Sequence, residues 1–188
     1  MLKLFSRSAA LAIFLSIAIP AQAADDVQDA NKLFKQGQYA PAMAKVNAFL
    51  ANNPKDAQAR FLKGLILAEQ GNTADAIAVF SSLTEDYPEL PEPYNNLAVL
   101  YAGQGQYEKA KSALEMAIRT HPNYATAHEN LGDIYAKMAS QAYDRALQLD
   151  RSNGTISGSR ASNWNNYPWN SNWNIGLRAA CDDKFLPR

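Results

Sequence analysis

Apolar and small residues recur along this chain at helical spacing, and the pattern returns every 34 residues. Small residues mark one phase of the repeat, at Gly64, Ala98 and Gly132. Prolines mark a second phase, at Pro54, Pro88 and Pro122. A fixed period of this length is typical of stacked helical hairpins, in which each unit buries its apolar face against its neighbours.

The breaks in the pattern predict where the helices end. Gly71 and Gly105 fall between the two helices of their units, where glycine ends a helix at low steric cost. The predicted units cover about 23–56, which is degenerate, then 57–90, 91–124 and a truncated 125–150. No Gly, Pro or Asn interrupts residues 133–150, so we expect one continuous helix over 125–150. A break at Ser140, with the following segment folded back as a short cap, is the alternative.

The third unit resembles the tetratricopeptide repeat family, whose unit is a helix–turn–helix of 34 residues. The matching positions are Tyr94, Leu97, Ala98, Tyr101, Ala110, Leu114, Ala117 and Pro122. The resemblance covers about 23–150 and implies an all-α, right-handed superhelix of three to three and a half repeats. It also implies that the first helices line a concave groove that holds other proteins.

The family pattern assigns specific positions of this sequence to the groove. They are Gln58, Phe61, Leu65, Glu69, Glu92, Asn95, Val99, Ala102, Thr126, Glu129, Asp133 and Lys137. Asn96 and Asn130 match an asparagine that often holds peptide backbone in similar proteins. Relatives that bind an acidic C-terminus need Lys and Arg in the groove, which this chain replaces with Glu and Asn. The predicted ligand is therefore an extended or helical segment with apolar and basic residues. Packing against the degenerate first unit is an equal alternative for Phe61 and Leu65.

The first 23 residues have the pattern of a secretory signal peptide. Lys3 and Arg7 precede an apolar run that is too short to span a bilayer, and Ala21-Gln22-Ala23 forms a cleavage pattern. An uncleaved membrane anchor is the alternative. No Cys follows the run, so we do not expect a lipoprotein. The prediction is a periplasmic protein, resembling those of Gram-negative bacteria, with no membrane span after cleavage.

Residues 151–188 differ in composition from the repeats. They are rich in Asn, Ser and Gly and carry Trp164, Trp169 and Trp173, which predicts a low-complexity, disordered tail. Three interpretations stay open: a linker, a Trp-bearing recognition element, or the product of a shifted reading frame. The single cysteine, Cys181, cannot form a disulfide within the chain.

Charge and chemistry exclude several classes of function. Lys3 and Arg7 lie in the predicted signal peptide, and without them the chain has 16 basic and 18 acidic residues. A nucleic-acid-binding protein needs a basic stripe, which this composition does not favour. His121 and His128 lack the spacing of a helical metal site, and no motif indicates a catalytic residue, metal or cofactor. We therefore expect a non-catalytic adaptor of the cell envelope. Similar proteins serve envelope assembly, pilus or secretion systems. A structural or oligomerising subunit that acts through the projecting helix 136–150 is the alternative.

Overall fold

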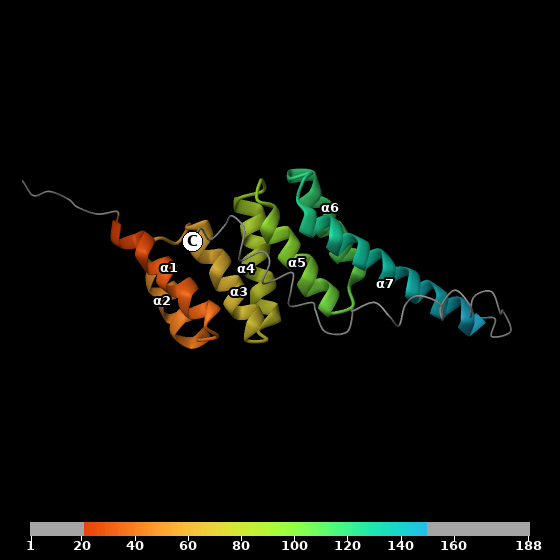
Figure 1. Cartoon of the computed structure of the whole chain (residues 1–188), viewed down its shortest axis with the longest axis horizontal. Coiled ribbons are helices and arrows are strands. Elements are labelled where there is room, and N and C mark those ends of the chain that lie inside the picture. The colour runs from red at the N-terminus through yellow and green to blue at the C-terminus, as the bar shows by residue number, and fades with distance from the viewer. Residues whose placement is uncertain (1–20, 150–188) are drawn as a thin grey trace, which may run out of the picture.

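The computed structural model describes residues 21–149, and all regular structure in this range is helical, which confirms the all-α prediction. The helices are α1 (Ala21–Lys35), α2 (Tyr39–Asn52), α3 (Ala57–Glu69), α4 (Thr73–Asp86), α5 (Pro91–Gly103), α6 (Tyr107–Thr120) and α7 (Ala125–Leu149). Successive helices pack as hairpins that follow one another along a row (Figure 1). The predicted signal peptide lies almost wholly outside the described residues, and the tail with Cys181 lies entirely outside them.

One turn joins the two helices of each hairpin, and the three turns have nearly the same geometry. Gly37, Gly71 and Gly105 have φ angles of 75°, 77° and 72°, a left-handed conformation that only glycine adopts at low cost. In each turn the residue after the glycine, which is the third after the helix, donates to a carbonyl five residues earlier, as the 2.9 Å bond from Asn72 N to Leu67 O shows. The prediction of glycine turns at 71 and 105 is confirmed.

The second helices bury residues at one constant spacing. A small residue is followed by a larger one four positions later and by a third residue three positions after that. The sets are Ala42, Val46 and Phe49 in α2, Ala76, Phe80 and Leu83 in α4, and Ala110, Leu114 and Ala117 in α6, all of them buried. This constant spacing produces one continuous core across the hairpins, as expected of a stacked repeat.

A single arginine joins the first and second helices of the second hairpin. Arg60 of α3 donates to Oδ2 of Asp86 at 2.6 Å and to the hydroxyl of Ser82, both on α4. Its guanidinium also lies 5.9 Å from the ring centre of Tyr87. The hydroxyl of Tyr87 donates to the carbonyl of Lys55, which precedes α3. These contacts tie the open end of the hairpin together.

The last helix is unbroken, as predicted, and the alternative of a break at Ser140 is wrong. α7 contains 25 residues, and a helix of that length is about 38 Å long at 1.5 Å per residue. It packs on α6 and, to a smaller extent, on α5, and then runs past them (Figure 1). In its second half the Leu149 side chain is 83% exposed, while Ala139, Tyr143, Ala146 and Leu147 are half-buried. No helix in residues 21–149 has the length and apolar character needed to cross a membrane.

Candidate partner-binding face

The predicted groove residues lie on the first helices of three successive hairpins. Gln58, Phe61, Leu65 and Glu69 belong to α3, the residues from Glu92 to Ala102 to α5, and those from Thr126 to Lys137 to α7. We call the surface formed by these residues the inner face. These residues comprise polar positions, apolar positions and a charged cluster, and their burial differs widely.

Asparagine side chains connect α5 to α7 on the inner face. Nδ2 of Asn130 donates to Oδ1 of Asn95 at 2.7 Å, and Nδ2 of Asn96 donates to the carbonyl of Glu92 at 2.9 Å. Asn95 and Asn96 are both 0% exposed. Their other polar atoms, Nδ2 of Asn95 and Oδ1 of Asn96, have no hydrogen-bond partner among the described residues. Adjacent positions of α5 therefore hold an unused donor and an unused acceptor.

Two carboxylates of the inner face also hold buried oxygens without a partner in the described part of the chain. These atoms are Oε2 of Glu92 and Oε1 of Glu69. The second oxygen of Glu69 accepts a 3.2 Å hydrogen bond from the hydroxyl of Tyr39 on α2. Buried acceptors of this kind favour a ligand that brings hydrogen-bond donors.

The apolar positions of the inner face belong to the core. Phe61 is 0% and Leu65 1% exposed, and the ring of Phe61 meets that of Phe80 edge to face with centroids 5.5 Å apart. Val99 and Ala102 are 6% and 5% exposed. Phe61 and Leu65 therefore belong to the core, with Phe61 against Phe80 of its own hairpin, and their contact with a ligand stays a prediction. Gln58 and Thr126 are half-buried and stay predicted contacts.

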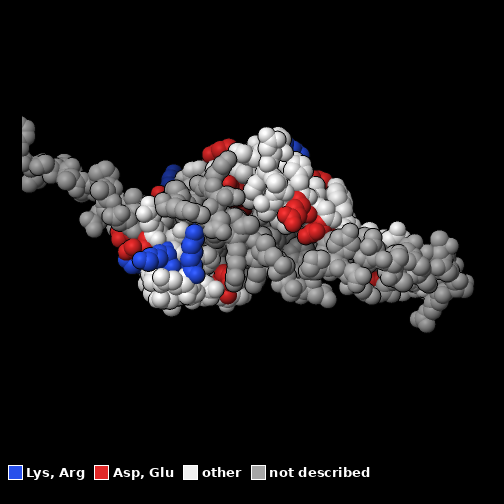
Figure 2. Space-filling model, viewed as in Figure 1, with Lys and Arg blue, Asp and Glu red and all other residues white. Residues whose placement is uncertain are grey.

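The part of the inner face on α7 is acidic. Glu129 is exposed, and Asp133 and Lys137 are half-buried one and two turns further along. Burial raises the pKa of the Asp133 carboxyl, the neighbouring charge of Glu129 raises it further, and Lys137 opposes both effects. Figure 2 shows acidic side chains both at the α1 end and near the middle of this view, and basic side chains mainly towards the α1 end. A basic ligand segment stays a prediction for the part of the inner face on α7.

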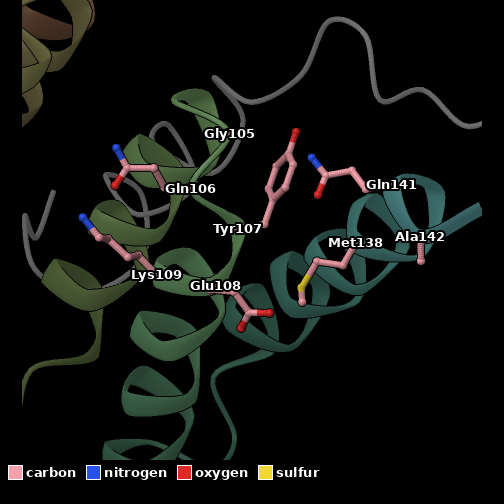
Figure 3. A pocket seen from close by; sticks show the side chains of 8 residues that line it. All are labelled: Gly105, Gln106, Tyr107, Glu108, Lys109, Met138, Gln141 and Ala142. Carbon is pink, nitrogen blue, oxygen red and sulfur yellow. The ribbon is translucent and has the colours of Figure 1, made fainter. Parts of the chain in front are cut away.

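A hollow that the sequence did not predict lies between the start of α6 and the middle of α7. Its volume is about 580 Å³, and Figure 3 shows the side chains of Tyr107, Met138 and Gln141 around it. The other lining residues are Gly105, Gln106, Glu108, Lys109 and Ala142. The hollow exists because α7 continues past the α5–α6 turn. Within residues 21–149, no group of three or more His, Cys, Asp or Glu side chains could hold a metal ion.

Comparison with known families decides the identity of the fold. Two family models, both described as tetratricopeptide repeat, match residues 28–91 and 67–133. Together they cover more than half of the chain. The chain is a tetratricopeptide repeat protein. Its seven helices in residues 21–149 make about three and a half repeats, with α7 as the first helix of the fourth.

The similar proteins match this chain through its repeats. The chain is 36% identical over 73 residues to the tetratricopeptide repeat domain-containing protein PYG7 of Arabidopsis thaliana, covering 36% of this chain and 24% of that protein. The crystal structure of YrrB, titled a TPR protein with an unusual peptide-binding site, superposes with a TM-score of 0.53 at 29% identity over 56% of this chain and 55% of YrrB. The Sgt2 TPR domain of Aspergillus fumigatus superposes with a TM-score of 0.61 at 16% identity, covering 68% of this chain and 85% of that domain. The chain spans a quarter or less of the first curated relatives that it matches.

Proposed function

We propose that this tetratricopeptide repeat protein is a non-catalytic scaffold that holds an extended or helical segment of a partner protein on its inner face. One observation carries the proposal: Asn95 and Asn96 are fully buried, yet each keeps one polar atom without a partner among the described residues. A buried polar atom left unpaired costs about 1–3 kcal/mol. A ligand that pairs these atoms would recover that free energy on binding.

The two free atoms are of the kinds that a peptide main chain can pair, one donor and one acceptor. Nδ2 of Asn95 can donate to a carbonyl, and Oδ1 of Asn96 can accept from an N–H group. Every peptide unit offers both groups, so the pair provides affinity with little dependence on sequence. The 2.7 Å bond from Asn130 holds the Asn95 amide in place, while its Nδ2 has no partner among the described residues.

Charge on the inner face provides the selectivity in this proposal. Glu129 and Asp133 lie on α7 beside the asparagines, and Glu69 and Glu92 add buried acceptors. We expect these groups to favour a segment with Lys or Arg next to apolar residues and to disfavour an acidic terminus. The YrrB structure, whose title reports a peptide-binding site, supports peptide binding as the function of similar repeats.

We further propose that the scaffold works in the cell envelope. This part rests on the signal-peptide pattern of residues 1–23, and it predicts a periplasmic protein without a lipid anchor. Fractionation of cells and mass spectrometry of the mature N-terminus test it. A chain that begins at Ala24 in the periplasmic fraction is expected, and an uncleaved chain in the membrane fraction would contradict it.

A paired set of variants tests the groove. Asn96→Ala combined with Asn130→Ala should retain fewer partner proteins in a pull-down while keeping the helical circular-dichroism signal. Asn47→Ala combined with Asn123→Ala is the matched control, because both of these asparagines are exposed and lie outside the inner face. Proteins held by the wild-type chain and the control but lost from the first variant are partners of the inner face. Equal retention by all three chains would refute the assignment.

A further inference from the structure

Within residues 21–149, one repeated position has a neighbouring second helix in the first three repeats and none in the last. Ala30 and Ala98 occupy this position in α1 and α5 and are 0% and 1% exposed. A Cβ atom added to Gly64 of α3 would meet the Phe80 ring at 2.7 Å. Gly132 holds the same position in α7, but it is exposed, and an added Cβ atom would meet nothing within 4 Å. Among the described residues, nothing occupies the place beside Gly132 that a second helix fills in the first three repeats.

The second half of α7 has the residues of that missing helix. The spacing that α2, α4 and α6 bury returns here as Ala139, Tyr143 and Ala146. Their counterparts in α4 and α6 are all 0% exposed, whereas these three are only half-buried. One continuous helix therefore carries both surfaces that pack within a repeat. The receiving surface, around Gly132, is where a second helix packs in the other repeats. The inserting surface, around Tyr143, has the residues of such a second helix.

A straight helix cannot bring these two surfaces together within one chain. Gly132 and Tyr143 lie on the same side of α7, because their separation in sequence corresponds to about three helical turns. The same separation places them about 16 Å apart along the axis. The receiving surface can therefore contact the inserting surface only of another molecule.

We propose that two copies of this chain pair through antiparallel α7 helices, each inserting its second half beside Gly132 of the other. The two-fold axis then passes near Ala136 and Ala139, which lie on the same side of α7 as Gly132 and Tyr143 and around the midpoint between them. The Gly132–Tyr143 contact is made twice, as two-fold symmetry requires. This pairing goes beyond the function of the inner face, since it uses a different side of α7.

The surface of α7 supports this arrangement. Ala127 and Ile134, 0% and 1% exposed, mark the side that faces the hairpin stack. Gly132 lies about 160° around the helix from Ile134, so a second copy can approach from the opposite side without meeting the stack. The large apolar side chains that are exposed within the described residues, Tyr135 at 50% and Leu149 at 83%, both lie on α7.

Light scattering on the purified chain across a range of concentrations tests the pairing. We expect twice the chain mass for the wild type. Gly132→Leu should dissociate the dimer and raise its dissociation constant on the order of tenfold or more, because the added side chain fills the space of Tyr143. Gly103→Leu is the matched control and should stay dimeric, since a side chain there also meets nothing within 4 Å. A monomeric wild type, or a Gly132→Leu variant that dimerises as well as the control, would overturn the proposal.

Disulfide trapping then tests the register independently of stability. Copies with Gly132→Cys are mixed with copies carrying Tyr143→Cys, both in a Cys181→Ser background. Mild oxidation should link the two kinds of chain and should link neither kind to itself. Absence of the mixed disulfide, or equal self-linking of Gly132→Cys, would show that the helices do not pair in this antiparallel register.

Discussion

Nδ2 of Asn130 donates a 2.7 Å hydrogen bond to Oδ1 of Asn95, and this bond joins the last helix to the preceding first helix across the inner face. Asn95 is completely buried and Asn130 is half-buried. The bond therefore has two roles: it fixes α7 against α5, and it orients the amide that we propose binds a partner's main chain.

Removing Asn130 should weaken the fold measurably. In Asn130→Ala, Oδ1 of Asn95 loses its donor while staying buried, so we expect a loss of about 1–3 kcal/mol in the free energy of unfolding. Urea unfolding followed by circular dichroism measures this loss. Asn47→Ala, at an exposed position, should change stability by less than about 0.5 kcal/mol. Equal effects of the two substitutions would show that the Asn95–Asn130 bond contributes nothing.

Alanine at two equivalent glycines should have opposite effects on stability. In Gly64→Ala the new Cβ meets the Phe80 ring at 2.7 Å inside the core, so we expect a loss of about 1–3 kcal/mol. In Gly132→Ala nothing of the same chain lies within 4 Å, so in dilute solution, where the proposed dimer is dissociated, the higher helix propensity of alanine should raise stability by about 0.5–1 kcal/mol. Thermal and urea unfolding of both variants test this, and destabilisation by Gly132→Ala would contradict it.

Arg60 should contribute more to stability than an ordinary surface cation. Arg60→Ala removes the contacts to Asp86, Ser82 and the Tyr87 ring, and its side chain is only 13% exposed. We expect a loss of about 1–2 kcal/mol, part of which stays at high salt because the stacking contact is not screened. Lys111→Ala breaks an ion pair to the exposed carboxylate of Glu108 within one helix and should reduce stability much less than Arg60→Ala does, because solvent screens this pair.

Asp133 predicts a dependence of stability on pH. Its pKa is raised in the folded chain, so the folded state binds this proton more tightly than the unfolded state does. The charged form therefore opposes folding, and its cost appears as pH rises from the ordinary carboxyl value of 3.8 through the raised pKa. Asp133→Asn should be slightly more stable than the wild type at neutral pH and equal to it in acid. If the wild type loses no stability relative to Asp133→Asn over this pH range, the raised pKa of Asp133 is contradicted.

The repeat made much of this fold predictable, because the same position has the same structural role in successive repeats. Gly71 and Gly105 marked the turns, and the residues from 133 onward, free of helix breakers, predicted the continuous α7. These features depend on local propensity and on the phase of the repeat.

Contacts between neighbouring repeats were not predictable in the same way. The Asn95–Asn130 bond depends on how far α7 is shifted along α5, which no single-helix pattern gives. The hollow beside Tyr107 likewise depends on where α7 passes the α5–α6 turn. The sequence identified Asn95 and Asn130 as inner-face residues but could not show that they bond to each other.

The most direct test of the inner face is an NMR titration of the labelled chain with a peptide selected for binding from a random library. Side-chain amide signals of Asn95, Asn96 and Asn130 report on the proposed contacts individually. Our account predicts that the Asn95 and Asn96 signals shift first and furthest, and that Asn47 on α2 does not move. Shifts confined to α2, α4 and α6, with the Asn95 and Asn96 amides unchanged, would contradict the proposed binding face.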